Sequence, residues 1–548
     1  MAGGEPLGFD CQPARGNSAG CRARGLSRPI LDGKGEDLRE NVKTQVSTDF
    51  RATGTPAVGK VLQRVFSFPT MLGSVLVVLA FLTLRERFDD PDMWWHLKIG
   101  ETIWTTHHIP LTDLFSYTTN HHASIPHEWL AELTMYAAYR FGGYTGLMLW
   151  VCLLASAFLV AGYWLCSLYS GNPKVGFAGA VIIWTFATVG LAVRPQLIGY
   201  TFLILELAII HLGRHRSPRW FFWLPVLTAV WVNCHGSFAL GLVVQGIFLF
   251  SSFFTFKAGL LVSERWDRPR QMNMAVALVL SMAATLLNPV GIEQIRYPIE
   301  TMLASASGGE VVQEWQATQL TDLRGIALMA VLLCCFLLVA VRRSDLALDE
   351  LLLLTAATWL GVSHMRMLFV FGILVAPILS RLLSTSWEGY DPAQDRIWPN
   401  AAFVALALLV VVLVFPSRKN LESQVERFSP VKAVQFIKTN HISGPMLNDW
   451  TDGGYLMWAL PEHPVFIDGR GDVYDWAGVL TEFGDWATVR TDPNVLLEKY
   501  KINFCVLWNH SLMARVLPLL PNWRLVYSDE HSVIFVRTYP GARAGSEK

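Results

Sequence analysis

Long apolar runs alternate with short polar segments along most of the chain. Runs of about 17–25 mostly apolar residues suffice for a helix to cross a bilayer core of roughly 30 Å. Such runs start near Phe66, Tyr144, Lys174, Gln196, Arg219, Ser237, Met274, Gly325, Asp349, Arg366 and Ala401. The pattern predicts an α-helical polytopic membrane protein with about eleven transmembrane helices over residues 61–416.

The pattern changes at both ends of the chain. Residues 1–60 are rich in Gly, Arg, Ser and Asp without apolar periodicity, which predicts a disordered tail. After Pro416, short apolar runs bounded by Gly, Pro, Asn and Asp predict a small α/β domain over residues 417–548. Strands are expected in HPVFID, INFCVLW, WRLVYS and SVIFVR, and helices in PVKAVQFIKT, DPNVLLEKY and LMARVLPLL.

Basic residues orient the predicted spans, because Lys and Arg in short loops stay in the cytoplasm. Arg51, Lys60 and Arg64 place the N-terminus in the cytoplasm. The other basic loops agree only if residues 129–141 form a helix along the membrane interface. The first loop, residues 85–143, and the C-terminal domain then lie outside the cytoplasm. A true span at residues 129–141 would instead turn several basic loops outward.

Composition supports a membrane protein and narrows its partners. Apolar residues make up 52% and charged residues 16%, against roughly 25% charged residues in soluble domains. The 44 basic and 44 acidic residues balance, which gives no reason to expect nucleic acid as a partner. The eight cysteines show neither a disulfide framework nor paired zinc-ligand spacing.

The first outer loop carries many of the side chains that are able to take part in catalysis or metal binding. Asp89, Asp90 and Asp92 stand within four positions, and two further acidic residues follow at Asp113 and Glu128. Clustered carboxylates suit a metal ion, a general base or both. Acidic residues just outside a membrane span are often only solvated and have no function. Here several carboxylates occur together with tryptophan and histidine residues, and this combination favours a functional site.

Aromatic and imidazole groups accompany these carboxylates. Trp94 and Trp95 could stack on a sugar face or lie among lipid headgroups. The loop also carries six of the 14 histidines, namely His96, His107, His108, His121, His122 and His127.

Polar residues in other turns fall on the same predicted side of the membrane. Arg194 in AVRPQ suits phosphate binding or a snorkelling position at a helix end. Asn233 and His235 in WVNCHGSF indicate either a site or a helix–helix turn. Glu314 beside a tryptophan and Arg366 in HMR complete the group, and Arg366 is a second candidate phosphate ligand.

Taken in order, these features resemble a known family. The matching segments are DPDMWWHLKIGE, FSYT, HEWL, RPQ, WVNCHGSF, NPVG and EW, followed by DGGYLMWAL, FIDGRGDVY and WRLVY. An acidic pair in the first outer loop after the first of about eleven spans resembles the GT-C membrane glycosyltransferases. These include protein O-mannosyltransferases, aminoarabinose-lipid A transferases and oligosaccharyltransferases. The chain resembles more closely uncharacterised bacterial membrane proteins grouped with them, over roughly residues 66–540.

The resemblance implies a transferase of the bacterial inner membrane. It would move a sugar from a polyprenyl-phosphate carrier to a glycan, lipid or protein acceptor at the outer face. Asp90 or Asp92 would be the catalytic carboxylate, Asp113 would assist it or bind metal, and Arg194 and Arg366 would hold the carrier phosphate. A divalent cation, Mg²⁺ or Mn²⁺, would lie at Asp90 and Asp92 if one is used.

The remaining candidates and alternatives complete the prediction. Glu128 is a further catalytic candidate, and Trp94, Trp95, His96, His127, Asn233, His235 and Glu314 are substrate-binding candidates. The tail lacks a sequon-binding WWD-type motif, which counts against an oligosaccharyltransferase. A transporter or flippase is the main alternative, although the polar residues gather at one face and no internal repeat is evident. A non-catalytic membrane scaffold is the third.

Overall fold

The computed structural model describes residues 57–119, 121–298, 300 and 315–538. From Val61 onward the described residues form one compact unit. Most of the predicted disordered tail therefore lies outside the described residues, as does the candidate Glu314. Helix α2 (Ala57–Val65) begins within the last residues of the segment predicted to be a disordered tail.

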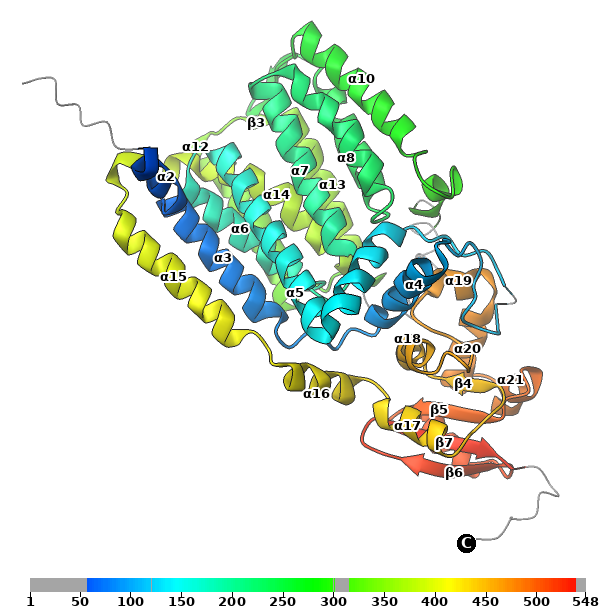
Figure 1. Cartoon of the computed structure of the whole chain (residues 1–548). Helices are drawn as coiled ribbons and strands as arrows, with labels where there is room; N and C mark the ends of the chain where they lie inside the picture. Colours follow the sequence, from blue (N-terminus) through cyan, green and yellow to red (C-terminus); the bar gives the residue numbers. More distant parts are fainter. Residues whose placement is uncertain (1–56, 120, 299, 301–314, 539–548) are drawn as a thin grey trace, which may run out of the picture. The chain divides into compact units, whose positions relative to one another are not determined.

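A helix lies in each of the eleven segments predicted to be apolar spans (Figure 1). These helices are α3 (Phe68–Leu84), α5 (Trp129–Ser170), α6 (Pro173–Ala187), α7 (Gln196–His215), α8 (Trp223–Trp231), α9 (Phe238–Ser251), α10 (Arg268–Ala284), α12 (Leu323–Arg342), α13 (Leu348–Ser363), α14 (Leu368–Leu383) and α15 (Ile397–Val414). Within the described residues, five helical segments are long and apolar enough to cross a membrane: α5, α7, α12, α15 and Met365–Leu383, which includes α14. The count of eleven spans stays a prediction.

Capping residues set where several of these helices begin. The Ser67 side chain accepts the backbone N–H of Thr70 ahead of α3, and the Asn172 side chain accepts that of Lys174 ahead of α6. Both helices also carry proline in the first turn, where a missing N–H leaves no helical bond unmade. Helix α15 then packs beside α3 (Figure 1), and Asn400 Nδ2 donates to the Phe66 carbonyl at 3.1 Å.

Helix α5 contains the segment predicted to lie along the interface. Gly143 has φ 56° and ψ −146°, a conformation that favours glycine, and it interrupts the helix after residue 142. Residues 129–141 are thus a helical segment separated by a kink from the long apolar part of α5. Their orientation relative to a membrane stays a prediction.

Helix α4 (Asp92–Thr106) packs closely against the first turns of α5. The contact is closest at Gly100, where an added Cβ would lie 2.4 Å from the Glu132 carbonyl oxygen and 2.8 Å from Tyr136 Cβ. Glycine is therefore required for the two helix backbones to approach this far. The contact lies one turn from His96 on α4, which brings His96 toward α5.

The C-terminal region forms a four-stranded sheet in the order β4-β5-β7-β6. Strands β4 (Met446–Asn448) and β5 (Phe504–Trp508) are parallel, whereas β7 (Ser532–Arg537) is antiparallel to both β5 and β6 (Trp523–Ser528). Helices α17 (Val431–Thr439), α21 (Pro493–Lys499) and α22 (Leu512–Val516) match the three predicted ones. Four more helices accompany them: α16 (Arg418–Phe428), α18 (Trp450–Ala459), α19 (Gly471–Trp476) and α20 (Val479–Ala487).

The strand predicted for HPVFID is wrong. Val465 makes only an isolated parallel bridge, and its partner is Ser116 of the first loop. The Val465 N–H donates to the Phe115 carbonyl at 3.0 Å. The apolar run of this segment therefore reflects burial rather than strand pairing, because Val465, Phe466 and Ile467 are all fully buried.

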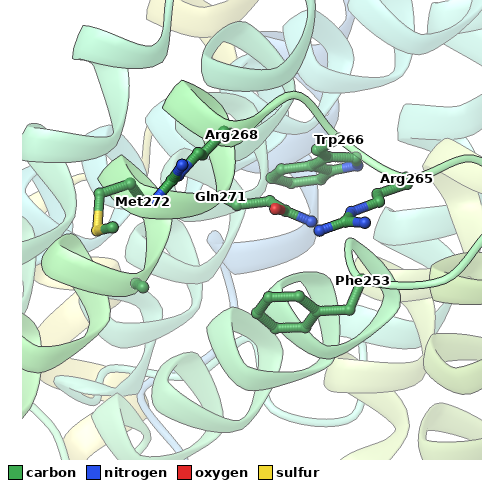
Figure 2. Close-up of a pocket in the computed structure, with 7 residues that line it drawn as sticks. Phe253, Arg265, Trp266, Arg268, Gln271 and Met272 are labelled. Atoms are coloured by element: carbon green, nitrogen blue, oxygen red, sulfur yellow. The ribbon is translucent and has the colours of Figure 1, made fainter.

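A cavity of about 550 Å³ lies where α9 meets α10 (Figure 2). Phe253, Arg265, Trp266 and Gln271 are among its lining residues. The Gln271 Nε2 and the Trp266 backbone N–H both donate to the Ser252 carbonyl, at 2.7 and 3.0 Å. The cavity follows the end of α9, whereas the predicted site residue His235 precedes its start. This cavity is therefore separate from the candidate active site.

Candidate active site

A cavity of about 280 Å³ brings together residues from distant parts of the chain. Seven predicted site residues line it: Asp92, Trp95, His96, His127, Glu128, Arg194 and Arg366. They come from α4, the end of the first loop, and the turns that precede α7 and α14. The structure thus gathers at one place residues that the sequence spreads over more than half its length.

Arg194 binds both first-loop carboxylates. Its Nε contacts Asp90 Oδ2, and its Nη1 lies 3.1 Å from Asp92 Oδ2. Asp90 is buried, and its other oxygen accepts the backbone N–H of Asp92 at 3.0 Å, at the first turn of α4. Asp92 is the more accessible carboxylate and lines the cavity, whereas Asp90 does not. Asp90 therefore positions Arg194 and the start of α4.

A second group of carboxylates lies where α4 meets α5. His96 Nδ1 is 3.0 Å from Glu132 Oε1 and 3.6 Å from Glu128 Oε2. All three residues are buried, and one ligand atom of each lies within 4.8 Å of the others. Within the described residues, Glu132 Oε2 has no hydrogen-bond partner. These three residues can hold a metal ion.

Burial controls the charge of these groups. Burial lowers the pKa of His96 well below its ordinary value, and the positive charge of Arg194 lowers it further. Burial raises the pKa of Glu128, although His127 and Arg366 partly offset this effect. An apolar environment disfavours the charged form of each group. The His96 ring is therefore neutral beside the carboxylate cluster.

Two more histidines face the other oxygen of Glu128. His235 Nε2 lies 3.3 Å and His127 Nε2 lies 3.6 Å from Glu128 Oε1. The Ser237 backbone N–H donates to His235 Nδ1, so the His235 ring proton is on Nε2 and points to the carboxylate side. His127 stacks on Tyr297, with the ring centres 4.1 Å apart.

The two predicted phosphate ligands line the same cavity. Arg194 lies in the turn before α7, and Arg366 lies between α13 and α14. The Arg366 guanidinium is 5.4 Å from the centre of the Trp315 ring, a cation–π contact that orients it. A guanidinium offers paired donors that match a phosphate.

Three predicted site residues do not line the cavity and pack elsewhere. Trp94 is buried, with its ring centre 4.8 Å from that of Tyr455, and it does not line the cavity. Asn233 accepts from Trp129 Nε1 at 2.8 Å and donates to the Ala229 and Leu287 carbonyls, so it joins three segments.

Asp113 is the third of these residues, and its side chain is fully buried. Arg470 Nη1 donates to it at 2.7 Å, and the Ser116 and Thr119 hydroxyls also contact it. Burial raises the pKa of Asp113, but Arg470 and the two hydroxyls outweigh this and leave the pKa below its ordinary value. Asp113 does not line the cavity. Its contacts join the first loop to the C-terminal region.

Residues of the C-terminal region also line the cavity. Trp450, Gly469, Arg470 and Asp472 are among them. A Cβ added at Gly469 would lie 2.1 Å from Asp92 Oδ1, so any other residue there would displace the Asp92 carboxylate. The polar motif FIDGRGD was visible in the sequence, but no local pattern indicated that it reaches the first loop.

Comparisons with known proteins bear on the fold. No model of a known protein family matches the sequence, and no curated protein matches it. Among solved structures, the chain is similar to the oligosaccharyltransferase AglB of Archaeoglobus fulgidus in complex with an inhibitory peptide and a dolichol-phosphate. The TM-score is 0.51 at 11% identity, over 86% of this chain and 74% of that chain.

A second structure of an oligosaccharyltransferase from Archaeoglobus fulgidus, tethered to an acceptor peptide with the NVT sequon, is also similar. Its TM-score is 0.50 at 11% identity, over 87% of this chain and 75% of that chain. Identity this low establishes the fold alone. The chain therefore has the GT-C fold of membrane glycosyltransferases, as the sequence resemblance predicted.

Proposed function

We propose that the protein transfers a sugar from a polyprenyl-phosphate carrier to an acceptor at the outer face of the bacterial inner membrane. The observation that carries the proposal is one cavity lined by Asp92, Arg194 and Arg366. A carboxylate able to act as a base and two guanidinium groups able to bind a phosphate are the groups this reaction needs. The solved neighbour with bound dolichol-phosphate supports a carrier of this type.

Each group has a defined role in the proposed reaction. Arg194 and Arg366 would hold the carrier phosphate and stabilise the negative charge that grows on it as the sugar leaves. Asp92 would accept the proton of the attacking acceptor group. Attack from the side opposite the phosphate inverts the anomeric centre. The oxocarbenium character of the transition state also favours nearby carboxylates, such as Glu128.

The ion assigned from the sequence to Asp90 and Asp92 is not part of this proposal. Arg194 already contacts both carboxylates and supplies the positive charge they require.

The C-terminal region contacts the first loop through Arg470 and Asp113, and α18 packs on α4. These contacts support the prediction that both lie on one side of the membrane, outside the cytoplasm.

Turnover by the purified full-length protein in lipid nanodiscs tests the proposal. The donor is a panel of polyprenyl-phosphate sugars, and the readout is release of polyprenyl phosphate. We expect Asp92→Asn to lower turnover by about 100-fold or more, a typical contribution of a general base. Asp89→Asn is the matched control, because Asp89 is exposed and belongs to the same acidic motif.

Two results would refute the assignment. Equal turnover in Asp92→Asn and the Asp89→Asn control would exclude Asp92 as the base. Movement of a lipid-linked sugar across the membrane without release of polyprenyl phosphate would favour the flippase alternative.

A further inference from the structure

We propose that His96, Glu128 and Glu132 form a binding site for a divalent transition-metal ion, Zn²⁺ or Mn²⁺. The three donor atoms lie within 4.8 Å of one another. His96 Nδ1 is 3.0 Å from Glu132 Oε1 and 3.6 Å from Glu128 Oε2. With metal–ligand bonds of about 2.0–2.2 Å, neighbouring ligand atoms lie about 3–3.5 Å apart. The side chains are thus close to the spacing that one shared ion requires.

A buried oxygen of Glu132 has no hydrogen-bond partner in the described part of the chain, which points to a missing ligand. Glu132 is 2% exposed, and its Oε2 has no hydrogen-bond partner within the described residues. A buried carboxylate oxygen without a donor is strongly unfavourable. A cation bound between the carboxylates removes this deficit, and it also neutralises two acidic groups one helical turn apart.

The fold sets this arrangement through helix geometry. Glu128 precedes α5 and Glu132 lies in its first turn, four residues apart, so both side chains extend from one face. The close contact at Gly100 brings α4 against this face, and His96 is one turn earlier on α4. Two of the three ligands therefore come from helices and the third from the residue next to one, which holds their positions before an ion binds.

Neighbouring histidines orient the ligands. His127 Nδ1 faces the Ile125 carbonyl at 3.1 Å, which places the ring proton on Nδ1 and leaves a lone pair on Nε2. That Nε2 lies 3.6 Å from Glu128 Oε1, next to His235 Nε2 at 3.3 Å. Such outer groups fix the orientation of a ligating carboxylate.

The chemistry of the donors selects the class of ion. Two carboxylate oxygens and one imidazole nitrogen suit Zn²⁺ or Mn²⁺, whereas Ca²⁺ and Mg²⁺ prefer oxygen ligands alone. His96 and Glu128 line the cavity with Arg194 and Arg366, and Glu132 lies behind them. A bound ion would therefore keep a side open to the cavity, as ions that take part in reactions do.

The role of the ion rests on the proposed transferase function, but its binding does not. Facing the cavity, the ion would supply further positive charge to the carrier phosphate beside the two arginines. Metal binding is measured without any sugar donor, so failure of the metal site and failure of the transferase proposal give different results.

The test uses the full-length protein in nanodiscs, stripped with a chelator and titrated with Mn²⁺ and Zn²⁺. Bound Mn²⁺ is followed by electron paramagnetic resonance, and retained Zn²⁺ by mass spectrometry after desalting. We expect one high-affinity ion per chain and nitrogen coupling from one imidazole in the Mn²⁺ spectrum. Glu132→Gln and His96→Gln should each weaken binding by about 100-fold or more, since loss of supporting groups alone weakens metal binding 10–100-fold.

Glu101→Gln is the matched control, because Glu101 lies on α4 and pairs with Lys98 outside the cluster. It should bind the ion as the wild type does. Fluorescence-detected gel filtration establishes that each variant is folded. If Glu132→Gln does not fold, the imidazole coupling in the wild type and its loss in His96→Gln decide the matter. Wild type that retains no more ion than a folded Glu132→Gln or His96→Gln variant would overturn the proposal.

Discussion

Replacing Arg470 by methionine should destabilise the C-terminal region strongly. The Arg470 guanidinium lies between two fully buried carboxylates, with Nη1 2.7 Å from Asp113 and Nη2 2.6 Å from Asp468. Its own side chain is only 4% exposed. Methionine fills similar volume without charge, so the substitution leaves two buried carboxylates without their shared cation.

The expected loss of stability follows from the balance of charge among Arg470, Asp113 and Asp468. Removing one partner of a buried ion pair costs about 3–5 kcal/mol. Asp113→Asn should cost less, about 1–3 kcal/mol, because the Arg470–Asp468 pair remains balanced and the Asn oxygen still accepts hydrogen bonds. The double variant should be less destabilised than the sum of the two single changes, because their effects are coupled.

Limited proteolysis in nanodiscs measures this difference. Cleavage within residues 417–548, mapped by mass spectrometry, tracks the opened population when opening is fast. A loss of 3 kcal/mol raises that population by about 100-fold or more, at roughly 1.4 kcal/mol per tenfold change. Arg490→Met is the control, since Arg490 is exposed and pairs with Asp485 at 3.8 Å. Equal cleavage of Arg470→Met and the control would refute the reasoning.

Three further predictions follow from the same contacts. Gly100→Ala should lower thermal stability by about 1–3 kcal/mol through overpacking against α5 and weaken metal retention, whereas Gly73→Ala, with open space at its Cβ, should do neither. Burial lowers the pKa of His531, but the Asp452 carboxylate 2.8 Å from its Nε2 outweighs burial, so the pKa is raised above its ordinary value. The stabilisation by protonated His531 is therefore present below pH about 6.5 and is lost as pH rises through the folded-state pKa. Melting temperatures measured from pH 5 to 9 should show this loss. The His531→Gln variant should lack this part of the pH dependence. Single cysteines at exposed Leu114 and Leu519 should react with a membrane-impermeant reagent from the same side; labelling from opposite sides would contradict the predicted topology.

The helices were predictable because their signal is local. A run of apolar residues specifies a helix of known length without reference to any partner. Strands β5, β6 and β7 were predictable for the same reason, since each is a short run rich in β-branched and aromatic residues. The HPVFID segment misled because its apolar run is buried without a strand partner: among the described residues, its one bridge is to the first loop, about 350 residues earlier. A short apolar run alone does not distinguish the two cases.

The site was only partly predictable. Asp92, Glu128, Arg194 and Arg366 were found because charged residues at the ends of apolar runs are conspicuous. Glu132 was not among the predicted site residues, although its spacing of four residues from Glu128 indicates that the two side chains extend in the same direction. The contribution of the C-terminal residues depends on chain packing over long sequence distances, which one sequence does not reveal.

The contact between Gly469 and Asp92 also bears on the order in which the site is assembled during synthesis. About 380 residues separate the two along the chain, and synthesis proceeds at roughly 5–20 residues per second. The first loop therefore spends on the order of 20–75 s in place before the backbone that closes over Asp92 is made. During that interval Asp113 also lacks Arg470, its charge partner in the folded protein. The cavity is complete only after residue 472 has been made, so a chain released before that point would carry the acidic residues without their enclosure.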